Sequence, residues 1–197
     1  ADAFPYMTPT GLEYDSGNYH GLLDLLVAES GYHNLRQEQL ERRTTSGQLL
    51  GIGVSIVVDS TAWFSRTEGA SIRLNDDGNI IVLTGSASAG QQHGNLYRSI
   101  VQRLLPVTSD QIYVVEGDTD QWSQSDGTMG SRTAQLAGTA VLRSVERLHD
   151  SLREVAAKQF EADIEDIVFY PGGSIGVRGV PSRSLTFAQL VTFSEEP

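Results

Sequence analysis

Two segments of this sequence repeat one pattern: an apolar run, a glycine-rich loop and then an amphipathic run. The first apolar run is residues 80–83, and its loop extends from Thr84 to His93. The second apolar run is residues 112–115, and its loop extends from Glu116 to Arg132. Each pattern predicts a strand, a loop and a helix. The two together restrict the chain to folds in which helices pack on a sheet.

The other apolar patterns extend this plan. Helices are predicted at 20–30, at 34–43 with Asn34 as N-cap, at 96–104, from about Ser131 to Phe160, and from Ser184. Strands are predicted at 50–59, 68–74, 79–84, 111–116, 167–170 and 175–177. Residues 50–59 are expected to form a buried strand. The fold class that follows is α+β: a two-layer α/β domain with a mixed sheet over residues 48–197. An extended arm and a linker of two short helices precede it, over residues 1–47.

Composition excludes several classes of protein. The formal net charge is −11, from 25 acidic and 14 basic residues, which argues against nucleic acid or an anionic membrane as a partner. The absence of cysteine excludes disulfides, thiolate metal sites and a cysteine nucleophile within this chain. No signal peptide opens the sequence, and the apolar run 49–58 is too short to span a bilayer. We therefore expect a cytoplasmic protein without membrane insertion.

The two glycine-rich loops are the candidate binding elements. A helix N-terminus exposes backbone N–H groups and a partial positive charge, so two of them predict a pocket for an extended, phosphate-bearing ligand. The segment Gly127–Arg132 adds a hydroxyl and a guanidinium. In the alternative interpretation the loops are plain turns, His93 is structural, and Ser131 caps a helix beside a solvated Arg132. Both interpretations place Arg132 in an exposed position, where it contributes little stability.

Other candidate motifs are weaker. The segment Gly172–Gly176 has the letters of a hydrolase nucleophile motif around Ser174, but strands are predicted on both sides where a helix should follow. The histidines lack metal-ligand spacing, and Asp118, Asp120 and Asp126 lack the order of a calcium loop. We therefore assign no catalytic residue and no metal ligand.

Several motifs, taken in order, resemble the molybdopterin-binding large subunit of the molybdenum hydroxylases. They are Gly51-Ile-Gly, Leu83-Thr-Gly, Gly90-Gln-x-His, Val115-x-Gly-Asp-Thr and Gly127-Thr-x-Gly-Ser-Arg. That family includes carbon monoxide dehydrogenase, xanthine dehydrogenase and aldehyde oxidase, and the carbon monoxide dehydrogenase branch is the most similar. The resemblance covers almost the whole chain. It implies a middle section of a longer subunit, because the family's substrate loop and catalytic glutamate are not in it.

The resemblance implies a cofactor and partners. The cofactor is molybdopterin carrying molybdenum, alone or as a cytosine dinucleotide. By position, the binding residues are Gly90, Gln91, Gln92, His93, Thr128, Met129, Gly130, Ser131 and Arg132. The partners are iron–sulfur and flavin subunits or domains, with a homodimer of the large subunit. The section by itself is expected to be inactive.

The sequence departs from the family at two places. Gln92 replaces a usual glycine, so its side chain is expected to crowd the ligand or to alter the backbone. Met129 replaces a frequent aromatic residue. The alternative function is therefore a non-catalytic binding or assembly module that kept the fold and lost the cofactor.

Overall fold

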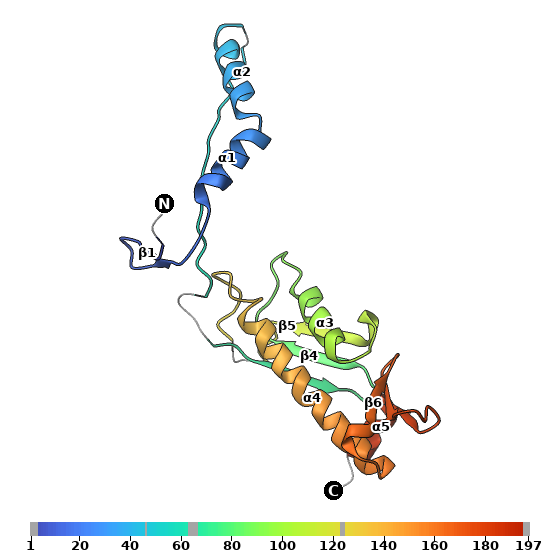
Figure 1. The fold of residues 1–197 in the computed structure, drawn as a ribbon. Coiled ribbons are helices and arrows are strands. Elements are labelled where there is room, and N and C mark those ends of the chain that lie inside the picture. Colours follow the sequence, from blue (N-terminus) through green and yellow to red (C-terminus); the bar gives the residue numbers. More distant parts are fainter. Residues whose placement is uncertain (1–3, 46, 63–66, 123–124, 195–197) are drawn as a thin grey trace. The chain divides into compact units, whose positions relative to one another are not determined.

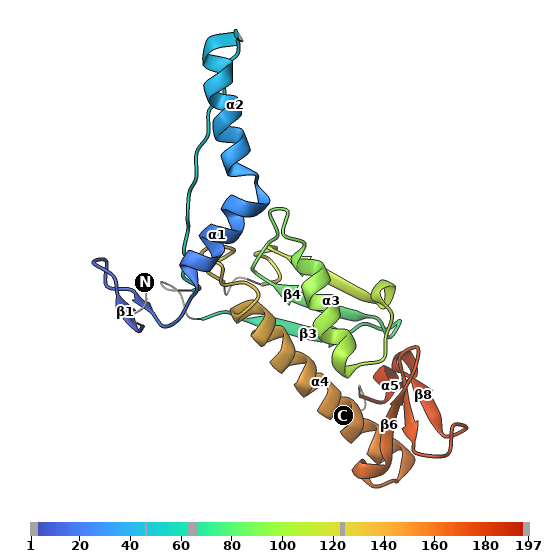
Figure 2. The same cartoon turned by 45° about the horizontal axis from the view of Figure 1, so that its top comes forward.

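A computed structural model describes residues 4–45, 47–62, 67–122 and 125–194. The chain divides into two compact units, Ala1–Val57 and Val58–Pro197, which are described separately (Figures 1 and 2).

The first unit is a small hairpin followed by two helices. Strands β1 (Tyr6–Met7) and β2 (Glu13–Tyr14) pair antiparallel, and helices α1 (Tyr19–Glu29) and α2 (Tyr32–Thr45) confirm the two predicted helices. The Asn18 side chain caps α1 by accepting from the backbone N–H of Gly21 at 3.0 Å. Helix α2 begins two residues before Asn34, so the prediction of Asn34 as its N-cap is wrong.

The prediction of a buried strand at residues 50–59 is also wrong. This stretch is not a strand, and its apolar side chains are mostly exposed; Val57 reaches 81% exposure. A strand needs a hydrogen-bonded neighbour, and none of the strands in the described residues pairs with this stretch.

The second unit is built on a three-stranded sheet in the order β3-β4-β5. Strand β4 (Ile80–Thr84) lies in the centre, antiparallel to β3 (Ala70–Leu74) and parallel to β5 (Ile112–Glu116). Helices α3 (His93–Leu104) and α4 (Leu136–Phe160) pack against each other and against this sheet (Figure 1). The core between these two layers contains Ile80, Val82, Tyr97, Val101, Val141 and Val145. This confirms the predicted two-layer arrangement and its mixed sheet.

A second sheet follows α4. Its strands β6 (Ile167–Tyr170), β7 (Ser174–Val177) and β8 (Ser184–Thr186) are antiparallel neighbours, and α5 (Phe187–Ser194) follows. Two single turns of 3₁₀ helix, Ser109–Gln111 and Ile164–Asp166, precede β5 and β6. Ser174 opens β7 between two strands and not before a helix, so the hydrolase motif lacks its context. Residues 184–186, predicted as the start of the last helix, form β8.

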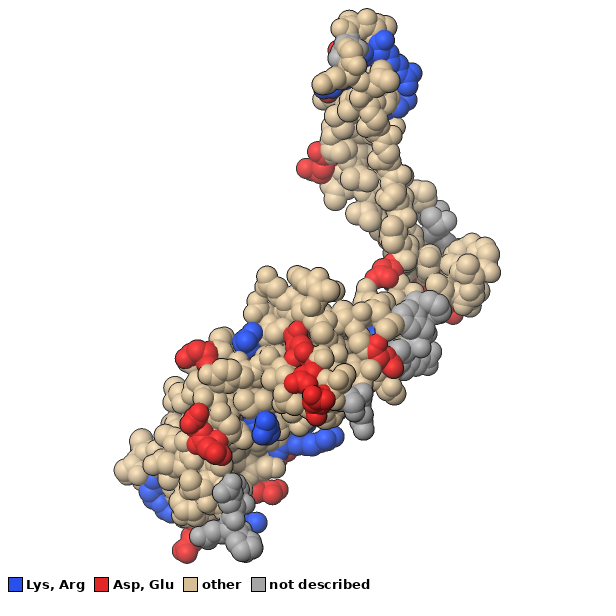
Figure 3. Space-filling view, turned by 180° about the vertical axis from the view of Figure 1, so that it is seen from behind, with Lys and Arg blue, Asp and Glu red and all other residues tan. Residues whose placement is uncertain are grey.

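The surface carries charges of both signs. On the face shown in Figure 3, acidic and basic side chains occupy separate small patches on a largely uncharged surface. Within the part of the chain that the structure describes, no helix is both long enough and apolar enough to cross a membrane.

Candidate functional site

The parallel pairing of β4 with β5 determines where the two glycine-rich loops start. Thr84 lies opposite Glu116 at the carboxyl ends of these strands. The backbone N–H of Gly117 also donates to the carbonyl oxygen of Thr84 at 3.0 Å. Both loops therefore leave the same edge of the sheet, which is where α/β folds commonly place ligand sites.

Direct contacts join the two loops. The Thr128 hydroxyl donates to the carbonyl oxygen of Ala87 at 2.6 Å. The backbone N–H of Ser88 donates to Glu116 Oε2 at 2.9 Å. A Cβ atom added to Gly85 would lie 2.1 Å from Ser125 Cβ, so the close approach of the loops at this point requires a glycine.

The joined loops form one pocket of about 450 Å³, within the usual size range of ligand sites. All the residues that the family resemblance assigned to cofactor binding line this pocket, except Gly90 and Gln92. Leu96, Thr133 and Ala134 also line it, although no sequence motif marked them as binding residues. Thr133 and Ala134 directly follow the assigned segment, and Leu96 lies one turn after His93 on α3. That adjacency was the one signal that could have identified them.

Gln92 and His93 occupy different environments. Gln92 has a left-handed backbone (φ 58°). Its side-chain oxygen accepts a hydrogen bond from the side-chain amide of Asn95 at 2.7 Å, so the Gln92 side chain lies along α3. Gln92 thus has a left-handed backbone that glycine adopts readily, and its side chain, which was expected to crowd the ligand, does not line the pocket. His93 is buried, and its Nδ1 lies 3.2 Å from the carbonyl oxygen of Ser86. It holds the first loop against the start of α3.

Arg132 is not the exposed residue that the sequence analysis expected, since it is only 1% exposed. Its Nη1 lies 2.8 Å from Glu68 Oε2 and donates to the carbonyl oxygen of Gly127 at 2.7 Å, and its Nη2 donates to the carbonyl oxygen of Thr67. Helix α4 starts at Leu136 and not near Ser131, because Ser131 adopts a left-handed backbone (φ 52°). The chain turns inward before the helix begins, and this turn buries Arg132.

Two buried donors in the pocket lining have no partner within the described residues. They are the Thr133 hydroxyl and Arg132 Nε. A buried polar group without a hydrogen bond is costly, so such atoms are candidates for contact with a bound molecule. Among the described residues, no group of three or more His, Cys, Asp and Glu side chains is arranged to hold a metal ion.

Comparisons with known proteins identify the family. Residues 25–197 match the family model described as molybdopterin cofactor-binding domain. The carbon monoxide dehydrogenase large chain of Afipia carboxidovorans is 30% identical over 204 residues, which cover 96% of this chain and 25% of that one. The corresponding large chain of Hydrogenophaga pseudoflava is 32% identical over 201 residues, which cover 96% of this chain and 25% of that one.

A solved structure extends the comparison to the fold. The crystal structure of quinoline 2-oxidoreductase from Pseudomonas putida 86 superimposes with a TM-score of 0.66 at 25% sequence identity, over 98% of this chain and 26% of that one. The chain thus spans about a quarter of the length of the relatives that it matches.

Proposed function

Because this chain belongs to the molybdopterin cofactor-binding domain family, we propose that it holds the pterin and phosphates of a molybdenum cofactor in a carbon monoxide dehydrogenase-like large subunit. One observation carries the proposal: the two loops, which lie far apart in the sequence, line a single pocket. The unpaired Thr133 hydroxyl and Arg132 Nε supply buried donors there. Pterin rings and phosphates are rich in acceptors, so these residues fit such a ligand.

Both sides of the pocket contribute polar groups in this proposal. Gln91 and His93 belong to the first side, and Thr133 supplies an unpaired hydroxyl from the second. The hydroxyls of Thr128 and Ser131 line the pocket but already donate to the Ala87 carbonyl oxygen and to Asp59. Glu68 already neutralises the Arg132 guanidinium, so the positive charge of Arg132 does little to attract phosphate. Its Nη atoms hold the loop, and only Nε is left for the ligand. The Arg132–Glu68 pair has no net charge, so hydrogen bonds rather than excess positive charge hold the cofactor, which suits a chain with a net charge of −11.

The proposal extends to the protein that contains this chain. The bound cofactor would supply the redox chemistry with which a molybdenum hydroxylase oxidises its substrate. Electrons would leave through iron–sulfur and flavin partners, and the large subunit would form a homodimer. None of the pocket residues is assigned to the chemical step. The alternative is the binding or assembly module without cofactor, and it makes the opposite prediction in the experiment below.

The test measures molybdenum and pterin in the purified protein that contains this chain, produced in a host that makes the cofactor. Thr133→Val keeps the side-chain shape and removes the unpaired hydroxyl. We expect cofactor affinity to fall about tenfold, since a hydrogen bond of about 1.4 kcal/mol corresponds to that factor. Ser99→Ala is the matched control, because it also removes one hydroxyl but lies outside the pocket lining. Wild-type protein without molybdenum or pterin would overturn the proposal and favour the module.

A further inference from the structure

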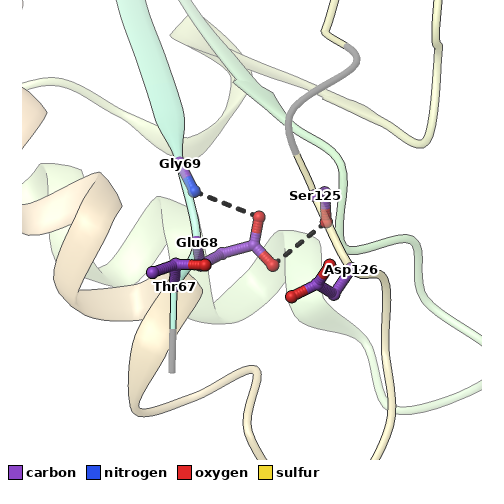
Figure 4. A pocket seen from close by; sticks show the side chains of 5 residues that line it. All are labelled: Thr67, Glu68, Gly69, Ser125 and Asp126. Atoms are coloured by element: carbon purple, nitrogen blue, oxygen red, sulfur yellow. Dashed lines mark hydrogen bonds between the residues drawn. The ribbon is translucent and has the colours of Figure 1, made fainter. Parts of the chain in front are cut away.

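Glu68 is a buried carboxylate in the second unit to which the proposed function gives no contact with the cofactor. It lies two residues before β3, and its side chain is 1% exposed. Figure 4 shows its carboxylate directed toward Ser125 and toward the backbone nitrogen of Gly69. Charged side chains are rarely buried to this degree unless they are paired.

Four donors surround this carboxylate. Oε2 accepts from the Ser86 hydroxyl at 3.0 Å, the Ser125 hydroxyl at 3.0 Å and Arg132 Nη1 at 2.8 Å. Oε1 accepts from the backbone N–H of Gly69 at 3.1 Å. Ser86 belongs to the first pocket loop, while Ser125 and Arg132 belong to the second. One carboxylate therefore contacts both loops.

A carboxylate accepts all four of these hydrogen bonds, and its charge neutralises Arg132. An amide could turn its single acceptor oxygen toward Ser86, Ser125 and Arg132, which all contact Oε2. It would carry no charge to neutralise Arg132, and it would direct an N–H group at the N–H of Gly69. A buried ion pair by itself is weak support for stability, because desolvation offsets most of the attraction; its best-attested role is to select one arrangement.

We propose that Glu68 is a positioning residue that sets the spacing of the two loops and so gives the pocket its shape. The consequence for cofactor binding rests on the function proposed above, whereas the effect on the loops does not. Glu68 touches no ligand in this proposal. It acts through Ser86 on one side and through Ser125 and Arg132 on the other.

The test is hydrogen exchange of the protein that contains this chain, purified from a host that cannot make the pterin. In Glu68→Gln we expect amides of residues 86–92 and 125–131 to exchange at least about tenfold faster, while residues 141–156 of α4 stay protected. Asp77→Asn is the matched control. It removes a carboxylate charge at an exposed position in the turn between β3 and β4, outside both loops, and both loops should stay as in wild type.

Ser86→Ala tests the contact of Glu68 with one loop alone and keeps both buried charges. It therefore tests the positioning role even where Glu68→Gln does not fold. It removes the contact from Glu68 to the first loop only, and we expect faster exchange confined to residues 86–92. Unchanged loops in these variants, or faster exchange spread equally over α4, would overturn the positioning role.

The same variants are then produced with the cofactor available. Loosened loops together with lower molybdenum and pterin content would support both proposals. Loosened loops in a protein whose wild type binds no cofactor would leave the positioning role standing and overturn the proposed function.

Discussion

Arg132 Nη1 lies 2.8 Å from Glu68 Oε2, and both side chains are almost completely buried. Removing one partner of such a pair leaves an uncompensated charge in the interior. Arg132→Ala is therefore expected to lower the free energy of unfolding by about 3–5 kcal/mol, measured by urea denaturation. Arg143→Ala removes an exposed arginine from α4 and should change it by no more than about 0.5 kcal/mol. Equal effects of the two variants would contradict the buried pair.

Gly85 of the first loop lies close to Ser125 of the second loop. A Cβ atom there would meet Ser125 Cβ at 2.1 Å, so Gly85→Ala should force the loops apart. We expect a loss of about 1–3 kcal/mol in unfolding free energy and a lower cofactor content. Gly53→Ala is the control, because a Cβ atom at Gly53 meets nothing within 4 Å. Equal effects of Gly85→Ala and Gly53→Ala would contradict the close contact with Ser125.

Gln92 adopts a left-handed backbone, with φ 58°, that favours glycine. Gln92→Gly should therefore raise the free energy of unfolding by about 1 kcal/mol, since this conformation costs other residues roughly 1–2 kcal/mol. Cofactor content should not change, because the Gln92 side chain is not part of the pocket lining. Gln92→Ala keeps the backbone strain and should show no such gain. A large rise in cofactor content in Gln92→Gly would mean that the side chain does crowd the ligand.

Tyr97 should make the free energy of unfolding decrease at alkaline pH. Burial raises the pKa of its hydroxyl from 10.0 to about 12. As the pH rises, the unfolded chain therefore loses this proton before the folded chain does. The contribution of Tyr97 to the free energy of unfolding is complete below pH 10 and is lost as the pH rises toward about 12. The loss should reach roughly 2–3 kcal/mol. Tyr97→Phe should remove this part of the pH dependence, whereas Tyr113→Phe, at an exposed position, should keep it. Parallel pH profiles for wild type and Tyr97→Phe would contradict the assignment.

The first unit should exchange its amide protons faster than the second. Helix α1 has no buried residue and α2 buries only Gln39, so these helices bury little apolar surface. In a confirmed monomer of the 197-residue chain, hydrogen exchange should show α1 less protected than α4. Equal protection would mean that the first unit packs on a surface that its own contacts do not reveal.

The elements of the second unit were predictable from sequence because their patterns are local. The three- and four-residue spacing of Val141, Val145, Leu148 and Leu152 identifies α4. The apolar run Ile80–Leu83 identifies β4. The stretch at residues 50–59 has an equally apolar pattern, yet it forms no strand. A strand needs a hydrogen-bonded neighbouring strand, which can lie anywhere in the chain. The composition of a segment alone therefore does not determine whether that segment forms a strand.

The pocket, too, has features that local sequence predicts and features that only the fold decides. Local chemistry alone indicated the two candidate loops, since glycines and hydroxyls after two strands are visible in the sequence. The burial and ion pairing of Arg132 were decided only by the fold, because its partner Glu68 lies 64 residues away. The close approach of Gly85 and Ser125 is likewise invisible until β4 and β5 pair in parallel. Local sequence specifies backbone preference and side-chain chemistry, whereas burial and charge pairing depend on which distant residues meet when the sheet forms.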